Sequence, residues 1–151
     1  MGTFPIESEI FLQLITALLL GSLLGFERLL AGKEAGMRTF GLVAVGSCLF
    51  VVIGDIVLLD THYGIYNFDP LRIASSVVTG IGFIGAGLII FQHELKGLTT
   101  AAALWVASAI GVAVGFKLYI VAMFTTFLTL FVCVGLWFVE RYLEKMVSHK
   151  K

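Results

Sequence analysis

The chain has 151 residues, of which 59% are hydrophobic and only 13% are charged, and its mean hydropathy is +1.03. A small water-soluble domain cannot bury that much apolar surface, so the composition excludes one and predicts an integral membrane protein. Ten Lys and Arg residues balance ten Asp and Glu residues, and a net charge of zero gives no indication of nucleic-acid binding.

Five apolar segments cover most of the sequence: residues 10–26, 40–59, 73–91, 97–116 and 118–139. Each is close to the roughly 20 residues that cross about 30 Å of hydrocarbon. Only Lys117 separates the last two segments, which predicts a tight turn near residues 115–117. No Lys or Arg precedes the first segment, so we expect no cleavable signal peptide. Because the apolar segments cover most of the chain, we expect a single transmembrane domain over residues 1–151.

The positive charges predict the orientation of these segments. With the N-terminus outside, eight Lys and Arg residues lie on the inner side and two, Arg72 and Lys117, lie outside. Cytoplasmic loops of membrane proteins carry the excess of Lys and Arg. We therefore expect a multi-pass protein of a bacterial inner membrane, with its N-terminus outside and its C-terminus in the cytoplasm.

Small residues are concentrated where helices are expected to pack. Glycine costs about 1 kcal/mol of helix propensity relative to alanine in water, but it lets membrane helices approach closely. The glycines at suitable positions are Gly21 and Gly25 in the first segment, Gly80, Gly82, Gly85 and Gly87 in the third, and Gly111 and Gly115 in the fourth. The prediction is an all-α bundle of about five transmembrane helices with the first, third and fourth at the centre. The aromatic-rich fifth segment is expected to face lipid or another subunit.

A polar loop, ERLLAGKEAGMRT, follows the first segment. One interpretation is an ordinary cytoplasmic hairpin held at the headgroups by positive charge. The other is that Glu27 pairs with Arg28 or Arg38 in a partly desolvated site, flanked by Lys33, that holds a partner, a phosphate or a cation. Thr99 and Thr100, after Lys96 and Gly97, either cap the fourth helix or form the floor of that same site, where a helix N-terminus favours an anion.

Asp55 is the one formal charge inside an apolar segment. It lies about 6 Å from the end of its helix by the helical rise, which favours an interfacial carboxylate over a proton or cation site. The outer loop adds Asp60, His62 and Asp69, which could join Asp55 in holding Mg²⁺, although their spacing matches no metal signature. Gln13 is expected to form a hydrogen bond between helices.

Three separate motifs together resemble the MgtC/SapB family of bacterial membrane proteins. The matching residues include Gly21, Gly25, Glu27, Arg28, Lys33, Gly36, Arg38 and Thr39; then Arg72, Ile73, Gly80, Gly82, Phe83, Gly85 and Gly87; and finally Gly97, Thr100, Trp105, Gly111 and Gly115. The resemblance implies about five helices and a link to growth in low magnesium and survival in host cells. It also implies restraint of the membrane ATP synthase. The chain departs from the family pattern at Ser76 and Thr99, and it is expected to be a short form without the C-terminal soluble domain of longer members.

Two functions from different classes remain. No nucleophile lies beside a suitable base, so an enzyme is not expected. A non-enzymatic modulator of a membrane complex, linked to magnesium homeostasis or stress adaptation and forming homo-oligomers, is favoured because the sequence offers few ionisable groups at mid-membrane depth. The alternative is a Mg²⁺ or proton-coupled ion transporter, in which unwinding of the glycine-rich third segment would supply ligands.

Overall fold

The fold is a bundle of long helices with one small hairpin. The computed structural model describes residues 6–60, 69, 71–92 and 94–148. The described elements are α1 (Ile6–Leu30), α2 (Met37–Asp60), α3 (Leu71–Gly87), β1 (Ile90–Gln92), β2 (Glu94–Lys96), α4 (Leu98–Gly115), α5 (Tyr119–Phe131), the π-helical turn η1 (Val132–Leu136) and α6 (Trp137–Ser148). The predicted all-α membrane bundle is confirmed, apart from the antiparallel β1–β2 hairpin that joins α3 to α4.

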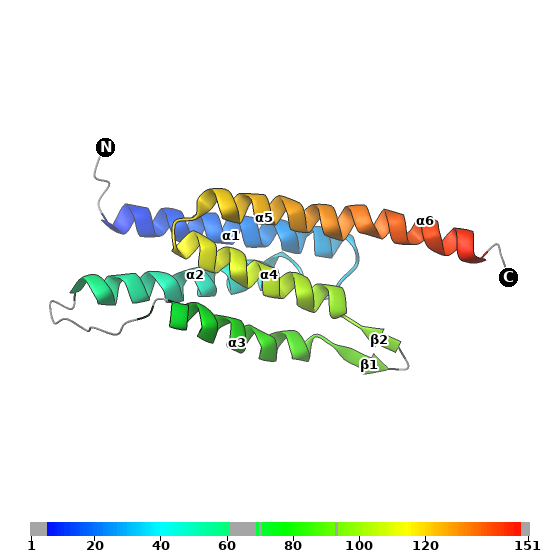
Figure 1. Cartoon of the computed structure of the whole chain (residues 1–151), viewed down its shortest axis with the longest axis horizontal. Coiled ribbons are helices and arrows are strands. Elements are labelled where there is room, and N and C mark those ends of the chain that lie inside the picture. The colour runs from blue at the N-terminus through cyan, green and yellow to red at the C-terminus, as the bar shows by residue number, and fades with distance from the viewer. Residues whose placement is uncertain (1–5, 61–68, 70, 93, 149–151) are drawn as a thin grey trace.

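From α1 to α5 each helix runs antiparallel to the one before it, so the bundle has two distinct ends (Figure 1). The end of α1, the start of α2, the hairpin and the start of α4 lie together, and we call this the Arg28 end. The start of α1, the α4–α5 turn and the start of α3 lie at the other end, which we call the Lys117 end. Four of the described helices are long and apolar enough to cross a membrane, with residues 7–30, 37–57, 98–115 and 119–147, while α3 is a shorter apolar helix of 17 residues.

The core lies where α1, α2 and α4 meet around Ala44. A Cβ atom built on Gly111 of α4 would lie 2.1 Å from the Ala44 carbonyl oxygen, and one on Gly21 of α1 would lie 2.6 Å from the Ala44 Cβ. A Cβ atom on Gly25 would lie 2.6 Å from the Gly36 carbonyl oxygen, and one on Gly115 would lie 2.7 Å from the Val51 Cβ. These four glycines therefore pack helices against one another, as predicted, because only a residue without a side chain fits at such distances.

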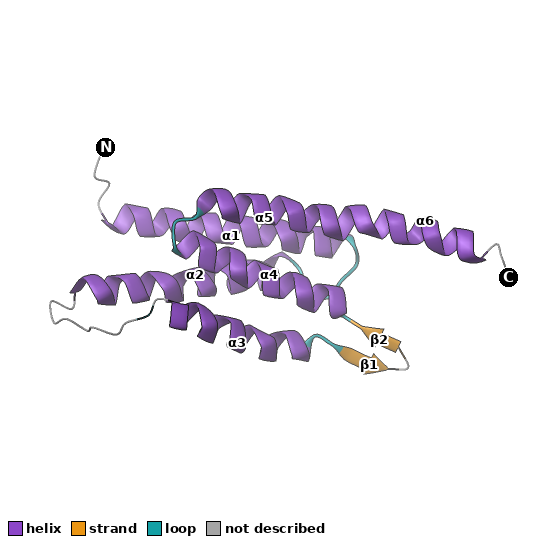
Figure 2. Ribbon diagram, viewed as in Figure 1, coloured by secondary structure: helices purple, strands orange, loops and turns teal. Residues whose placement is uncertain are grey.

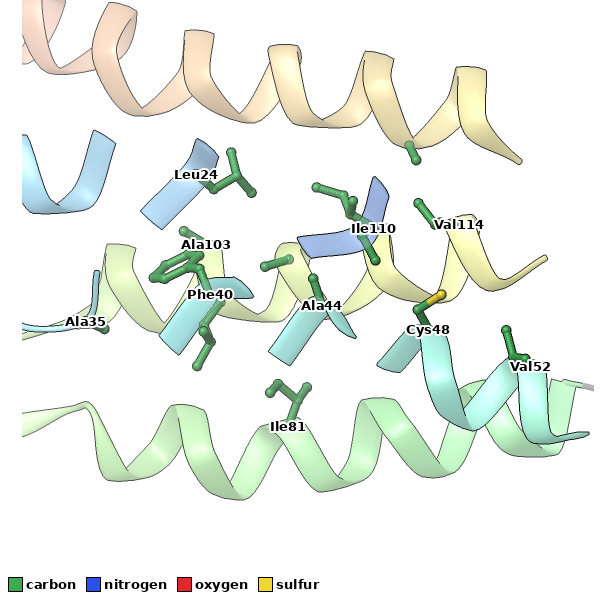
Figure 3. Packing of buried hydrophobic residues seen from close by; sticks show 14 residues of the cluster. Leu24, Ala35, Phe40, Ala44, Cys48, Val52, Ile81, Ala103, Ile110 and Val114 are labelled. Atoms are coloured by element: carbon green, nitrogen blue, oxygen red, sulfur yellow. The ribbon is translucent and has the colours of Figure 1, made fainter. Parts of the chain in front are cut away.

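The prediction that α3 belongs to the centre is wrong. Ile81 is its one residue classed as buried, and Figure 3 shows this side chain projecting toward α2. A Cβ built on Gly80, Gly82 or Gly87 would meet nothing within 4 Å, and one on Gly85 would touch only Ala101 at 3.9 Å. Helix α2 occupies the central place instead, because Phe40, Ala44, Cys48, Val51 and Val52 are all buried.

Both ends of α4 are defined by backbone geometry. Gly97 precedes the helix with φ of 91°, a left-handed conformation that favours glycine, and its Cβ would lie 2.2 Å from the Leu88 carbonyl oxygen. After Gly115, Lys117 adopts φ of 62° before α5 begins. The tight turn predicted at residues 115–117 is therefore present, and Glu9 of α1 forms an ion pair with Lys117 at 2.9 Å.

Helix α5 continues through the wide turn η1 into α6, and Figure 2 shows the three pieces as one long rod. Ala122 and Thr126 are the buried residues of α5, whereas Phe124, Phe127 and Phe131 point outward. Helix α6 extends beyond the other helices at the Arg28 end (Figure 1). The predicted outward position of the aromatic side chains is confirmed.

Candidate functional site

The Arg28 end contains a buried ion pair within the last turns of α1. Arg28 Nη2 donates a hydrogen bond to Glu27 Oε1 at 2.6 Å, and Arg28 Nε donates a second to Glu27 Oε2. The Arg28 side chain is 4% exposed and that of Glu27 is 14% exposed. Of the two partners expected for Glu27, the structure therefore selects Arg28. The two-point geometry fixes both side chains where a charge without a partner would be costly.

The loop between α1 and α2 is held close to this pair. The Lys33 backbone N–H donates to the Arg28 carbonyl at 3.0 Å, and Ala35 is 4% exposed. Gly25 of α1 lies directly against the backbone of Gly36 and Met37, because its Cβ would come within 2.6 Å of both. The loop is thus packed onto the end of α1, which gives its exposed side chains a defined position.

The other residues of the predicted cluster lie at the same end but are not joined to the ion pair. Lys33 and Arg38 are exposed, and Thr39 is half-buried in the first turn of α2. Within the described residues, the ion pairs are Glu27–Arg28 and Glu9–Lys117, so Arg38 does not pair with Glu27. The Arg28 end therefore presents Lys33 and Arg38 of this cluster as outward-facing cations, with Lys96 and the carboxylate of Glu34 also exposed there, around a neutralised buried pair.

The predicted role of Thr99 and Thr100 as caps is wrong. Gly97 takes the N-cap position of α4, and no side chain forms a capping hydrogen bond there. Both threonines lie inside the first turn, where Thr100 is buried and Thr99 is exposed. Of the two hydroxyls proposed as the floor of an anion site, only that of Thr99 faces outward at the Arg28 end.

Asp55 is half-buried in α2, toward the Lys117 end. Among the described residues, no group of three or more His, Cys, Asp or Glu side chains could hold a metal ion. Asp69 has another role, because its Oδ1 accepts the Leu71 backbone N–H at 2.9 Å where α3 begins. His62 and the Asp60 side chain lie outside the described part, so the predicted Mg²⁺ site stays a prediction.

Polar side chains inside the bundle bond across helices. Gln13 Nε2 donates to the Gly115 carbonyl at 2.7 Å and to that of Val114 at 3.4 Å, which joins α1 to the end of α4. This confirms the interhelical bond predicted for Gln13. A bond that was not predicted from the sequence joins α2 to α4, where the Ser47 and Ser108 hydroxyls lie 2.8 Å apart. The spacing of residues gave no signal for this pair, because the neighbours of Ser47 and Ser108 one helical turn away are mostly larger apolar residues.

Replacing Gln13 with methionine is expected to lower the stability of the bundle by about 1 kcal/mol, since methionine matches its length but cannot donate to the α4 carbonyls. A thermal melt of the purified protein in detergent measures the loss. Leu12→Met, at an exposed neighbouring position, serves as the control and should melt like the unmodified protein. An unchanged melt of Gln13→Met would show that the bond contributes nothing.

A groove opens between α2 and α3. It has a volume of about 940 Å³ and is lined by α2 between Leu42 and Val57, by α3 between Arg72 and Ile84, and by Ser108 of α4. We call it the α2–α3 groove. It follows from the peripheral position of α3, which reaches the core mainly through Ile81, and it was not predicted from the sequence.

Comparison with known proteins finds a matching family model and relatives from bacteria. The model of the MgtC family matches residues 14–142. The chain is 42% identical over 131 residues to a protein named putative magnesium transporter YhiD from Escherichia coli K12, covering 83% of this chain and 59% of that protein. It is 37% identical over 132 residues to SrpB from Synechococcus elongatus, covering 82% of this chain and 72% of SrpB. It is 46% identical over 100 residues to MgtC from Brucella abortus strain 2308, covering 66% of this chain and 39% of MgtC.

The chain thus spans about three fifths of the YhiD protein and about two fifths of the Brucella MgtC protein. No solved structure matches it.

Proposed function

Because this multi-pass membrane protein belongs to the MgtC family, we propose that it is a non-enzymatic modulator of a membrane complex linked to magnesium homeostasis or stress adaptation. In this proposal it resides in a bacterial inner membrane with the Arg28 end in the cytoplasm, where Lys33 and Arg38 meet the partner complex. The membrane ATP synthase is the partner that the resemblance to MgtC proteins suggests.

The observation that carries the proposal is the closed hydrogen bonding of the interior. Gln13, Ser47, Ser108 and Thr126 each bond within the bundle. Among the described residues, no buried side-chain nitrogen or oxygen lacks a partner. A carrier needs ionisable or polar groups near mid-membrane that are available to its substrate. Buried polar atoms that all have partners in the described part of the chain, together with the exposed Lys33 and Arg38 at the Arg28 end, fit a protein that acts through its surface.

The proposal predicts that the partner is captured from the Arg28 end. A photo-crosslinking amino acid placed at Leu30, beside the polar loop, should join the protein to subunits of a membrane complex in native membranes. Arg38 is expected to attract acidic groups of the partner, and Arg38→Glu would place a carboxylate against them. Because like charges across an interface cost several kcal/mol, this change should reduce the product about tenfold or more. A crosslinker at Leu118, exposed at the Lys117 end, is the matched control and should give no such product.

The transporter alternative is supported by the name of the YhiD relative and by the carboxylate of Asp55 in α2. Reconstitution into liposomes with a fluorescent Mg²⁺ or pH reporter separates the two functions. The modulator predicts no flux above that of empty liposomes. Flux that Asp55→Asn reduces, together with no crosslinked complex, would overturn the modulator and favour transport.

A further inference from the structure

We propose that the α2–α3 groove binds one anionic phospholipid, with its phosphate at Arg72 and its acyl chains along α2 and α3. The groove has a charged residue at one end only. Arg72 lies at the start of α3, at the Lys117 end, and is exposed. Arg72 makes no ion pair with any residue that the structure describes. Within the described part of the chain it therefore offers a cation without a countercharge where a lipid headgroup would lie.

The rest of the groove is effectively apolar. Its hydroxyl groups are already bonded inside the protein, because Ser47 and Ser108 bond to each other and Ser76 Oγ donates to the Arg72 carbonyl. The remaining lining is made of aliphatic side chains, Phe50 and glycine. A polar solute or a hydrated ion would find few free partners there, whereas hydrocarbon would not lose any hydrogen bond.

The length of the groove fits one leaflet of a bilayer. From Arg72 to Ile84 the rise of α3 is about 18 Å, and from Leu42 to Val57 that of α2 is about 22 Å. One leaflet contributes about 15 Å of hydrocarbon plus its headgroup layer. Arg72 at the membrane surface would match the phosphate of a phospholipid, and the apolar groove, which is about as long as one leaflet is deep, would match its acyl chains.

Two glycines make the groove wide enough for acyl chains. A Cβ on Gly46 or on Gly80 would meet nothing within 4 Å, so side chains could be accommodated there without strain. The absence of these side chains leaves space between α2 and α3. A large side chain at Gly80 would fill the groove without disturbing the backbone, and the same change at Gly82, which is equally open but does not line the groove, would leave it empty.

Native mass spectrometry of the purified protein, titrated with dioleoyl phosphatidylglycerol or dioleoyl phosphatidylcholine, tests the proposal. The unmodified protein should retain one phosphatidylglycerol in preference to phosphatidylcholine. Arg72→Gln should weaken phosphatidylglycerol binding about fivefold and leave phosphatidylcholine binding unchanged, as expected for one cation near a membrane surface. Arg141→Gln, which removes the same charge from exposed α6, should have no effect.

Gly80→Leu should reduce binding of both lipids, whereas Gly82→Leu should bind like the unmodified protein. Two results would overturn the proposal. One is lipid retention that neither Arg72→Gln nor Gly80→Leu changes. The other is a dimer that Gly80→Leu converts to a monomer and that added lipid does not affect, which would assign the groove to a second copy of the chain. Arg72→Gln adds no bulk, so it tests lipid binding even if Gly80→Leu folds poorly.

Discussion

Replacing Gly111 with alanine is expected to disrupt the packing of α4 against α2. The new Cβ would lie 2.1 Å from the Ala44 carbonyl oxygen and 2.9 Å from its carbonyl carbon. The obstacle is backbone at the point where α2 packs on α4, so no side chain can rotate away to make room. Helix α2 must shift as a unit, and we expect a loss of about 3 kcal/mol or more.

A thermal melt in detergent, with size-exclusion chromatography as a second measurement, detects this loss. Gly82→Ala is the matched control, because its Cβ would meet nothing within 4 Å and alanine favours a helix. We expect the control to melt at or slightly above the temperature of the unmodified protein. Equal melting of the two variants would contradict the close approach of α2 and α4.

Replacing Glu27 with glutamine is expected to cost about 3 kcal/mol, because it leaves the buried Arg28 guanidinium without a countercharge. The double variant Glu27→Gln with Arg28→Gln should recover part of this loss, since it removes the unpaired charge as well. Thermal melts of the two single variants and the double variant give the coupling free energy of the pair.

The exposed ion pair at the other end of the bundle provides the comparison. Glu9 and Lys117 are 45% and 49% exposed, so Glu9→Gln should cost less than about 1 kcal/mol. If Glu27→Gln and Glu9→Gln had equal effects, the Glu27–Arg28 pair would be a surface interaction rather than an anchor for the loop between α1 and α2.

The sequence was sufficient to predict the membrane helices because hydropathy and span length follow from the order of apolar and charged residues along the chain. It also located close packing at Gly21 and Gly111, since small residues four apart form a smooth helix face. The same argument failed for α3. Glycines lower the cost of contact with any neighbour, and their spacing does not tell whether that neighbour belongs to the same chain. Gly80 and Gly82 therefore looked central although they lie at the edge.

The candidate site was predicted in part. A carboxylate next to a guanidinium where a span ends indicated the Glu27–Arg28 pair, but the choice between Arg28 and Arg38 depended on how the loop packs. The cap of α4 was misplaced because Thr99 has a capping side chain, whereas Gly97 ends the preceding chain through its backbone conformation. The central role of α2 was missed because Phe40 and Cys48 did not fit a pattern of small residues.

The wide turn η1 determines the direction in which α6 faces. A π-helical turn holds one more residue than an α-helical turn, and each residue of an α-helix advances the azimuth by about 100°. Val132–Leu136 thus resets the phase between α5, which packs through Ala122 and Thr126, and α6, which extends past the bundle. Deleting a single residue from this turn would leave the packing of α5 unchanged but rotate every side chain of α6 about the helix axis by about 100°.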